Sequence, residues 1–337
     1  MKVREIAAVF GVAPSTVSLV LNGKPGVGDE LRKSIEEKLI ENGYTIKKEQ
    51  EERGTILFIY YISSRYLSNR KDNTFAMLLG GVQKVCKQKN YICSLIYAGH
   101  GELEEKIREA DEKADIRGIV FLGTEYFHSP DKVLLGAKTP LVVLDGFFPD
   151  YPLNTVNIDN AYGIYEEVKY LKEKGHQAVG YLRCGLPYGC LQDRRNCVEL
   201  VLRQMGLQLR EEDIVEVTQD TEALEEEIGT YLDRQKQLPT AFIADNDLIG
   251  IMAVKTMQAR GLRVPEDISV IGFDDAGLCQ LSTPKLTTVR ADFEKMGERA
   301  VYRLLRMMEE KDKCVEKLYI GTEFIERESV ARIGGSE

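Results

Sequence analysis

The chain of 337 residues is 43% hydrophobic, and its 45 basic and 54 acidic residues give a formal net charge of −9. This length exceeds one ordinary hydrophobic core and predicts about two or three domains. The sequence has no run of about 18 apolar residues, which excludes a membrane-spanning helix, and it begins without the apolar segment of a secretory signal, so we expect a cytoplasmic protein.

The seven cysteines are odd in number and scattered, and none belongs to a C-x-x-C pair. This usage argues against a disulfide framework and a zinc site, so we expect reduced, buried thiols and no metal. No Ser/His/Asp grouping or glycine-rich phosphate loop supports catalysis, so we expect no enzyme, no catalytic residue and no cofactor. His176 ends a predicted helix, where a cation suits the helix dipole.

Residues 3–22 predict two short helices joined by a turn at Gly11, because apolar residues recur at helical spacing on both sides of it. Gly11 suits a chain reversal that needs positive φ, and Pro14 suits the first position of a helix. The pattern is typical of a helix-turn-helix whose second helix presents side chains to a major groove. An ordinary helical hairpin fits these residues equally well. The outward-facing side chains are Ser15, Thr16, Ser18 and Leu19.

Residues 27–44 predict a third amphipathic helix, with Leu31, Ile35 and Leu39 at spacings of four and Gly43 after its end. With this helix, the stretch VAPSTVSLVLNG (12–23), together with Val27, Arg32, Ile35 and the pair Gly43-Tyr44, resembles the headpiece of the lactose/galactose repressor family. The resemblance continues through residues 239–247, 263–275 and 284–289, which match the regulatory-domain hallmarks of that family, and so covers nearly the whole chain.

This resemblance implies a ligand-controlled transcription regulator, a repressor, that binds double-stranded operator DNA. Its small all-α headpiece would contact DNA through a defined set of side chains. They are Arg4, Pro14, Ser15, Thr16, Ser18, Leu19, Asn22 and Tyr44. Residues 1–48 hold eight basic and six acidic residues, a net charge of only +2, so we expect a homodimer in which two headpieces act together.

The segment KKEQEERG (47–54) has no apolar face and lacks the hinge-helix motif of the resembled family, which favours a charged linker over a modified hinge. From Thr55 onward, strands and helices alternate, which predicts right-handed crossovers and doubly wound sheets. The resemblance implies a body like that of periplasmic sugar-binding proteins, with two subdomains joined by three crossings. We expect a headpiece at 1–46, a linker at 47–54 and a body at 55–337, with an N-subdomain of about 55–160 and 290–320 and a C-subdomain of about 161–289 and 321–332.

Ligands of such sheets bind beyond the carboxyl ends of the strands, where this chain places polar residues. Among them, Asp247 is expected to cap the following helix and Asp275 to accept from loop amides. The resemblance implies a carbohydrate-like effector held by Phe75, Asp145, Arg194, Asn246 and Asp274, with Phe147 as a weaker candidate. An aromatic residue that the family often has near position 221 is absent, and Gln219 stands there, which puts sugar stacking on that wall in doubt.

Two other function classes compete with a regulator. A solute-binding receptor-like sensor with weak or no specific DNA binding explains the body, but it does not explain residues 3–22 and would need an export signal. An enzyme would need acid/base groups such as Asp274 and Asp275, yet adjacent residues at a strand end point in opposite directions. Too few residues follow the IERES segment (325–329) for the leucine heptads that make tetramers, so a dimer is favoured.

Overall fold

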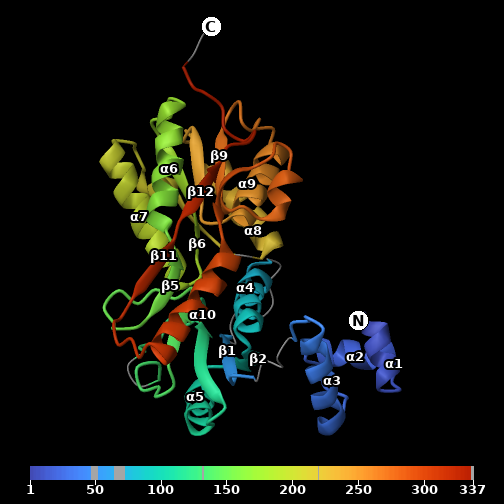
Figure 1. Ribbon diagram of the computed structural model, residues 1–337. Coiled ribbons are helices and arrows are strands. Elements are labelled where there is room, and N and C mark those ends of the chain that lie inside the picture. Colours follow the sequence, from blue (N-terminus) through green and yellow to red (C-terminus); the bar gives the residue numbers. More distant parts are fainter. Residues whose placement is uncertain (47–51, 64–72, 131–132, 219, 335–337) are drawn as a thin grey trace. The chain divides into compact units, whose positions relative to one another are not determined.

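The computed structural model describes residues 1–46, 52–63, 73–130, 133–218 and 220–334. The chain forms two compact units, Met1–Arg53 and Gly54–Glu337, which we describe separately. Figure 1 labels the helices and strands.

The first unit is a bundle of α1 (Val3–Val9), α2 (Pro14–Leu21) and α3 (Asp29–Glu41) within described residues 1–46. Gly11 has a φ of 65°, and Pro14 is the first residue of α2, which confirms the predicted turn and helix start. The apolar stripes meet in one fully buried cluster. Its members are Ile6, Ala7, Val17, Val20, Ile35 and Leu39.

Among the described residues, no single helix is long and apolar enough to cross a membrane. The pair α1 and α2 would be long and apolar enough only if taken together, and the chain bends by 111° between them.

The second unit contains two sheets, each with six strands in its described part. The first sheet has the order β11-β5-β4-β3-β1-β2, and the second has the order β12-β10-β9-β8-β6-β7. All neighbouring strands pair in parallel except β10 and β12, which are antiparallel. The strands of the first sheet are β1 (Thr55–Tyr61), β2 (Ile92–Ala98), β3 (Ile116–Leu122), β4 (Leu141–Leu144), β5 (Thr155–Ile158) and β11 (Lys317–Ile320). Those of the second are β6 (Val179–Cys184), β7 (Ile214–Val217), β8 (Ala241–Ala244), β9 (Ser269–Asp274), β10 (Thr287–Ala291) and β12 (Thr322–Ile325).

Helices follow most strands, as alternating strand and helix patterns require for parallel sheets. They are α4 (Thr74–Lys89), α5 (Leu103–Glu112), α6 (Asn160–Glu173), α7 (Gly189–Met205), α8 (Thr221–Arg234), α9 (Asp247–Ala259) and α10 (Phe293–Glu309), with short 3₁₀ turns at Glu211–Asp213 and Gly277–Gln280. Carboxylates or an amide cap four of these helices by accepting from backbone N–H groups. The caps are Asp159 for α6, Asp220 for α8, Asn246 for α9 and Asp292 for α10.

In its described part, the chain passes between the two sheets three times, after β5, after β10 and between β11 and β12. The last passage joins two edge strands through Gly321 alone. Figure 1 shows it as the continuous path from β11 to β12. One chain builds both sheets and connects them three times. A ligand that contacts both sheets therefore links two halves of the same unit.

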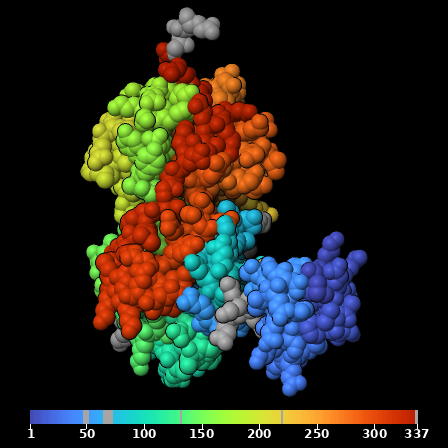
Figure 2. Space-filling model, in the orientation of Figure 1, coloured from blue at the N-terminus to red at the C-terminus, as the bar shows by residue number. Residues whose placement is uncertain are grey.

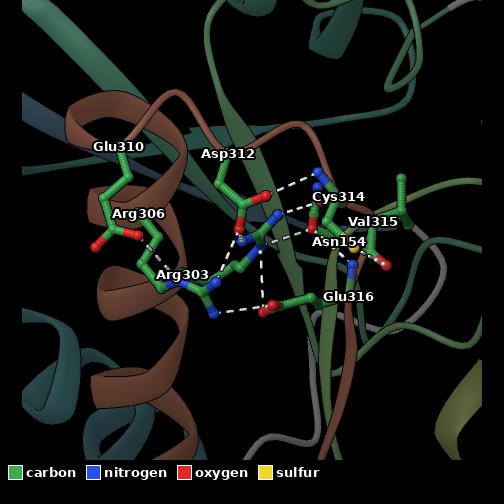
Figure 3. Close-up of polar contacts among 8 residues, drawn as sticks. All are labelled: Asn154, Arg303, Arg306, Glu310, Asp312, Cys314, Val315 and Glu316. Carbon is green, nitrogen blue, oxygen red and sulfur yellow. Dashed lines mark hydrogen bonds and ion pairs between the residues drawn. The ribbon is translucent and has the colours of Figure 1, made fainter.

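A buried arginine fixes the return from α10 to β11 (Figure 3). The Arg303 side chain is 1% exposed, and its guanidinium donates to Asn154 Oδ1 at 2.8 Å, to Asp312 Oδ2 at 2.5 Å and to the carbonyl oxygen of Cys314. Arg306 on the same helix pairs with Asp312 and Glu316 at 3.0 and 2.9 Å. Because a planar guanidinium group donates to several acceptors at once, this cluster holds in place the irregular segment between α10 and β11.

Two glycines allow α4 and α10 to cross closely. A Cβ atom on Gly81 would overlap the carbonyl oxygen of Glu294, and one on Gly297 would overlap the carbonyl oxygen of Leu78. In Figure 2 the surface of α4, in cyan, adjoins that of α10, in orange-red. Main-chain atoms cannot swing aside as a side chain can, so both positions require a residue without a side chain.

We expect Gly297→Ala to destabilise the protein by about 1–3 kcal/mol or more, because an added methyl group must push the two helices apart. Gly80→Ala is the control, since Gly80 lies in α4 next to Gly81, on the other side of the same crossing, but a Cβ there meets no atom within 4 Å. That control should stabilise the helix by about 0.5–1 kcal/mol. Urea denaturation measures both, and equal effects of the two changes would contradict the close crossing.

Candidate effector cleft and nucleic-acid interface

A cleft of ≈ 820 Å³, including the open space at its mouth, lies where the two halves of the second unit meet. Five of the six predicted effector residues line it together, namely Phe75, Asp145, Arg194, Asn246 and Asp274. They come from α4, the ends of β4, β8 and β9, and α7, so contributions from both sheets converge on one cavity.

Asp145 follows β4 and is buried in the wall of the first sheet. Its φ is 57°, a left-handed conformation that few non-glycine residues adopt. The Thr124 hydroxyl, after β3, donates to Asp145 Oδ2 at 2.6 Å. This bond orients the carboxylate, whose two oxygens together offer several acceptor positions.

Arg194 lies across the cleft on α7 and is 5% exposed. Its guanidinium donates to Asn160 Oδ1 at 3.0 Å, to the carbonyl oxygen of Asp245 and to Asp274 Oδ1 at 3.4 Å, and it stacks 3.6 Å from the centre of the Phe273 ring. Burial acts to lower the pKa of Arg194, but the Asp274 and Asp245 carboxylates outweigh it and raise that pKa. The cation is therefore fixed in place from several directions.

Asp274 and Asp275 are consecutive and both have positive φ, at 106° and 58°. Such conformations cost about 1–3 kcal/mol each and persist where the surroundings enforce them. Asp274 pairs with Arg194, whereas Asp275 pairs with Arg290 at 2.8 Å and with Arg327. The prediction that the two carboxylates diverge is confirmed. The prediction that Asp275 accepts from loop amides is wrong. Its carboxylate accepts instead from Arg290 on the neighbouring strand β10 and from Arg327 in the C-terminal segment.

Asn246, and not Asp247, is the cap of α9. Asn246 caps α9, because its Oδ1 accepts from the Ile249 N–H at 3.0 Å, and it also lines the cleft, where its amide nitrogen can donate to a ligand. Asp247 does not cap α9, so that prediction is wrong. Its carboxylate accepts from the Ala276 N–H at 2.6 Å and the Thr288 hydroxyl at 2.5 Å, and burial raises its pKa to about 6.

The sixth predicted residue, Phe147, does not line the cleft. Its backbone and Cβ lie against Gly189 at the start of α7, so its contact with an effector stays a prediction. Gln219 lies outside the described residues. The cleft also contains Thr124, Asn160, Tyr188 and Phe293, which sequence reasoning missed. Thr124 and Asn160 follow the ends of β3 and β5, so the strand-end rule would have found both.

Two buried groups outside the lining of the cleft, Glu167 and His176, behave differently from ordinary surface residues. Glu167 on α6 is fully buried, and neither carboxylate oxygen has a hydrogen-bond partner within the described part of the chain. Burial raises the pKa of Glu167 well above its usual range. His176 is also fully buried, its ring nitrogens lie 2.9 Å from Thr240 Oγ1 and 3.1 Å from the carbonyl oxygen of Ala331, and burial lowers its pKa. The prediction of a helix-end cation at His176 is therefore wrong.

The predicted DNA-contacting residues lie on the three-helix unit. Arg4, Pro14, Ser15 and Ser18 are exposed, and Thr16 and Leu19 are half-buried. The Asn22 amide donates to the Ser18 carbonyl oxygen at 2.8 Å, and the Tyr44 hydroxyl donates to the Met1 carbonyl oxygen at 3.1 Å, so both also have structural roles. Most of the predicted linker at 47–54 lies outside the described residues, and its character stays a prediction.

Comparisons with known proteins cover the whole chain. A family model described as a periplasmic binding protein-like domain matches residues 168–330. The ribose operon repressor of Haemophilus influenzae is 27% identical over 334 residues, covering 97% of this chain and 98% of that protein. A transcriptional regulator CelR–cellobiose complex has the same fold, with a TM-score of 0.72, 23% identity and coverage of 98% and 99%. The Lac repressor dimer bound to operator and the anti-inducer ONPF has a TM-score of 0.70, 21% identity and the same coverage.

The buried Glu167 carboxyl generates a pH prediction. Arg194 and the carboxylates of Asp247, Asp245 and Asp274 are the charged groups around it, and its raised pKa means that the folded protein holds this proton more tightly than the unfolded chain. Stability is therefore lost as pH rises above the ordinary value of 4.5, by about 1.4 kcal/mol for each unit of pKa difference. Glu167→Gln removes this loss, so its stabilisation over wild type should grow between about pH 5 and pH 8.

Glu173→Gln is the control for this measurement, because Glu173 lies on the same helix but is exposed. Urea denaturation across the pH range should give that control a small and constant difference from wild type. A Glu167→Gln difference that stays equally constant would mean that Glu167 is ionised and paired in the folded protein.

Proposed function

Since this chain is a member of the lactose/galactose repressor family of transcription regulators, we propose that it is a ligand-responsive repressor that binds operator DNA. The observation that carries the proposal is the presence, in one chain, of a small three-helix unit and a two-sheet unit with a polar cleft. A repressor related over almost its full length supports the same combination. No catalytic step belongs to this proposal, and the cytoplasm is where such a regulator meets its operator.

For DNA binding, α2 is the element that enters the major groove in this proposal. Ser15 and Ser18 are exposed on it, and Leu19 lies outside the apolar cluster that α2 shares with α1 and α3. One such unit carries few phosphate contacts, and proteins of this kind gain affinity by reading two half-sites with two-fold symmetry. A homodimer follows from this requirement, and the Lac repressor dimer bound to operator supports it.

For the effector, the charges of the cleft favour an uncharged, polyhydroxylated molecule. Asp145 and Asp274 are acidic, and among the described residues of the lining Arg194 is the cation, which is already paired with Asp274. A carboxylate or phosphate ligand would meet the Asp145 carboxylate without a free cation from these described residues to offset the repulsion. Sugar hydroxyls can donate to the carboxylates and accept from Arg194 and the Asn246 amide. The cellobiose and ribose bound in the structures of two similar regulators are molecules of this class.

Effector binding changes operator affinity, in this proposal, by joining the two halves of the body. Asp145 belongs to the first sheet, while Arg194, Asn246 and Asp274 belong to the half built on the second sheet. A molecule that bonds to both halves favours the arrangement in which the distance between the halves matches its own size. It shifts the equilibrium between arrangements only by the difference in its affinity for them. The three passages of the chain between the sheets are where such a movement is accommodated.

The proposal predicts that Asp274→Asn uncouples the effector from DNA. Asparagine tolerates the positive φ of this position but removes the charged acceptor, which should cost about 1.5–3 kcal/mol of effector binding, or roughly 10–100-fold in affinity. Fluorescence anisotropy with DNA selected from a random pool should show unchanged operator affinity and a lost response to a neutral sugar panel. Asp150→Asn, an exposed aspartate outside the cleft lining, is the control and should respond as wild type.

Failure to select any DNA sequence, with sugar-induced thermal stabilisation intact, would instead support a receptor-like sensor with weak or no specific DNA binding. Normal ligand-induced stabilisation of the Asp274→Asn variant would mean that the effector binds elsewhere.

The side chain at position 19 leads to a prediction about base preference at one position of each operator half-site. A leucine packs against a thymine methyl group but cannot make the bidentate contact to guanine that arginine makes. Leu19→Arg should therefore shift the selected sequence toward G at one position of each half-site. Leu19→Lys adds the same charge without the planar fork, so it should raise affinity for many sequences with less change in base preference. Identical selections for all three proteins would refute a base contact at residue 19.

A further inference from the structure

Two cysteine thiols meet at the junction of α4 and β2. Cys86 lies near the end of α4, Cys93 is the second residue of β2, and both side chains pack into the same apolar cluster. The turn between them is tight, because Asn90 adopts a left-handed φ of 60° and the Tyr91 N–H donates to the Cys86 carbonyl oxygen at 2.9 Å. A disulfide between Cys86 and Cys93 would close a short loop whose ends the fold already brings together.

The strand register places the two thiols in the same layer of the fold. Cys93 pairs with Ile56 of β1, whose side chain belongs to the buried cluster beneath α4. Cys86 belongs to the same cluster, and Cys93 packs against it. Both side chains therefore lie between α4 and the same face of the first sheet, where neither can turn away without opening the core.

The two thiols differ in access and in acidity. Cys86 is 1% exposed, whereas Cys93 is only half-buried on the edge strand. The neighbouring Cys86 thiol lowers the pKa of Cys93, whereas the Cys93 thiol and burial raise the pKa of Cys86. A reachable thiol with a lowered pKa beside a buried second thiol is the arrangement found in redox-sensing cysteine pairs.

We propose that Cys93 and Cys86 are a redox-active pair that forms a reversible disulfide when the protein meets a hydroperoxide. The Cys93 thiolate attacks the terminal peroxide oxygen, which breaks the O–O bond, releases an alcohol or water and leaves a sulfenic acid on Cys93. The Cys86 thiol then attacks the Cys93 sulfur, the S–S bond forms, and the sulfenic oxygen leaves as water. Both sulfur atoms are oxidised, the peroxide is reduced by two electrons, and a dithiol reductant reverses the change.

The pair lies on elements that also form the effector cleft. The opposite end of α4 supplies Thr74, Phe75 and Leu78 to the cleft. Phe75 stacks on Tyr60 of β1 with ring centres 4.4 Å apart, and Tyr60 lies 5.4 Å from the Tyr97 ring of β2. A covalent bond between α4 and β2 therefore fixes two of the elements that hold Phe75 in the lining of the cleft. The chemistry of the pair does not depend on the proposed effector or on DNA.

Mass spectrometry of the full chain tests the proposal directly. The reduced protein is exposed to hydrogen peroxide, remaining thiols are alkylated, and trypsin then separates the cysteines, because Lys84, Lys87 and Lys89 place Cys86 in residues 85–87 and Cys93 in residues 90–106. We expect these two peptides to be recovered as one disulfide-linked species that dithiothreitol separates. Thiols titrated after unfolding should fall from seven to five, since the bond consumes two of them.

Single substitutions distinguish the two roles. Cys86→Ser should leave a sulfenic acid on Cys93 that dimedone labels, and Cys93→Ser should abolish rapid oxidation at residue 86. Cys314→Ser, which changes an exposed cysteine far along the chain, is the control and should behave as wild type. Dimedone labelling of Cys93 in wild type with Cys86 still alkylated, or oxidation confined to Cys314, would overturn the proposal. So would a linked peptide that forms only in the unfolded protein.

Discussion

The structure of the cleft depends on the need to neutralise one buried guanidinium. Arg194 is almost wholly removed from water, and an unpaired charge in that position would cost several kcal/mol. Its acceptors come from three other elements: Asn160 begins α6, Asp245 follows β8 and Asp274 ends β9. Satisfying one side chain therefore fixes where two helices and two strands meet, and it aims the remaining polar groups into the cavity.

Neutralising Arg194 has consequences for the residues behind it. Asp245 is fully buried, where it accepts from the Tyr181 hydroxyl and from the Cys184 N–H at 2.7 Å, and burial raises its pKa. Asp274 reaches Arg194 only through an unusual backbone conformation, and its neighbour Asp275 is held by arginines on the other side. A carboxylate pair that resembles an acid/base dyad in sequence is thus divided between the cleft and an ion cluster.

Much of the fold could be predicted because it follows from local patterns. Apolar runs such as residues 55–62 predicted buried strands, and Gly11 and Pro14 predicted a turn and a helix start. The strand-end rule located Asp145, Asn246 and Asp274 in the cleft. The failures share a different property. Asp247 bonds to Thr288, Asp275 to Arg327 and His176 to Ala331, and each pair is separated by more than forty residues. Local spacing carries no information about such partners.

The sequence by itself determined the helices and strands, their order and the edge of the sheets where polar side chains gather, since each depends on neighbours within a few residues. Only the tertiary structure decided which charge pairs with which, that Glu167 lies in the core with no hydrogen-bond partner among the described residues, and that Cys86 and Cys93 pack into one apolar cluster. These outcomes depend on burial and on the meeting of distant segments. Burial changes the free energy of a charge or a thiol by more than any adjacent residue does, and it exists only once the chain has folded.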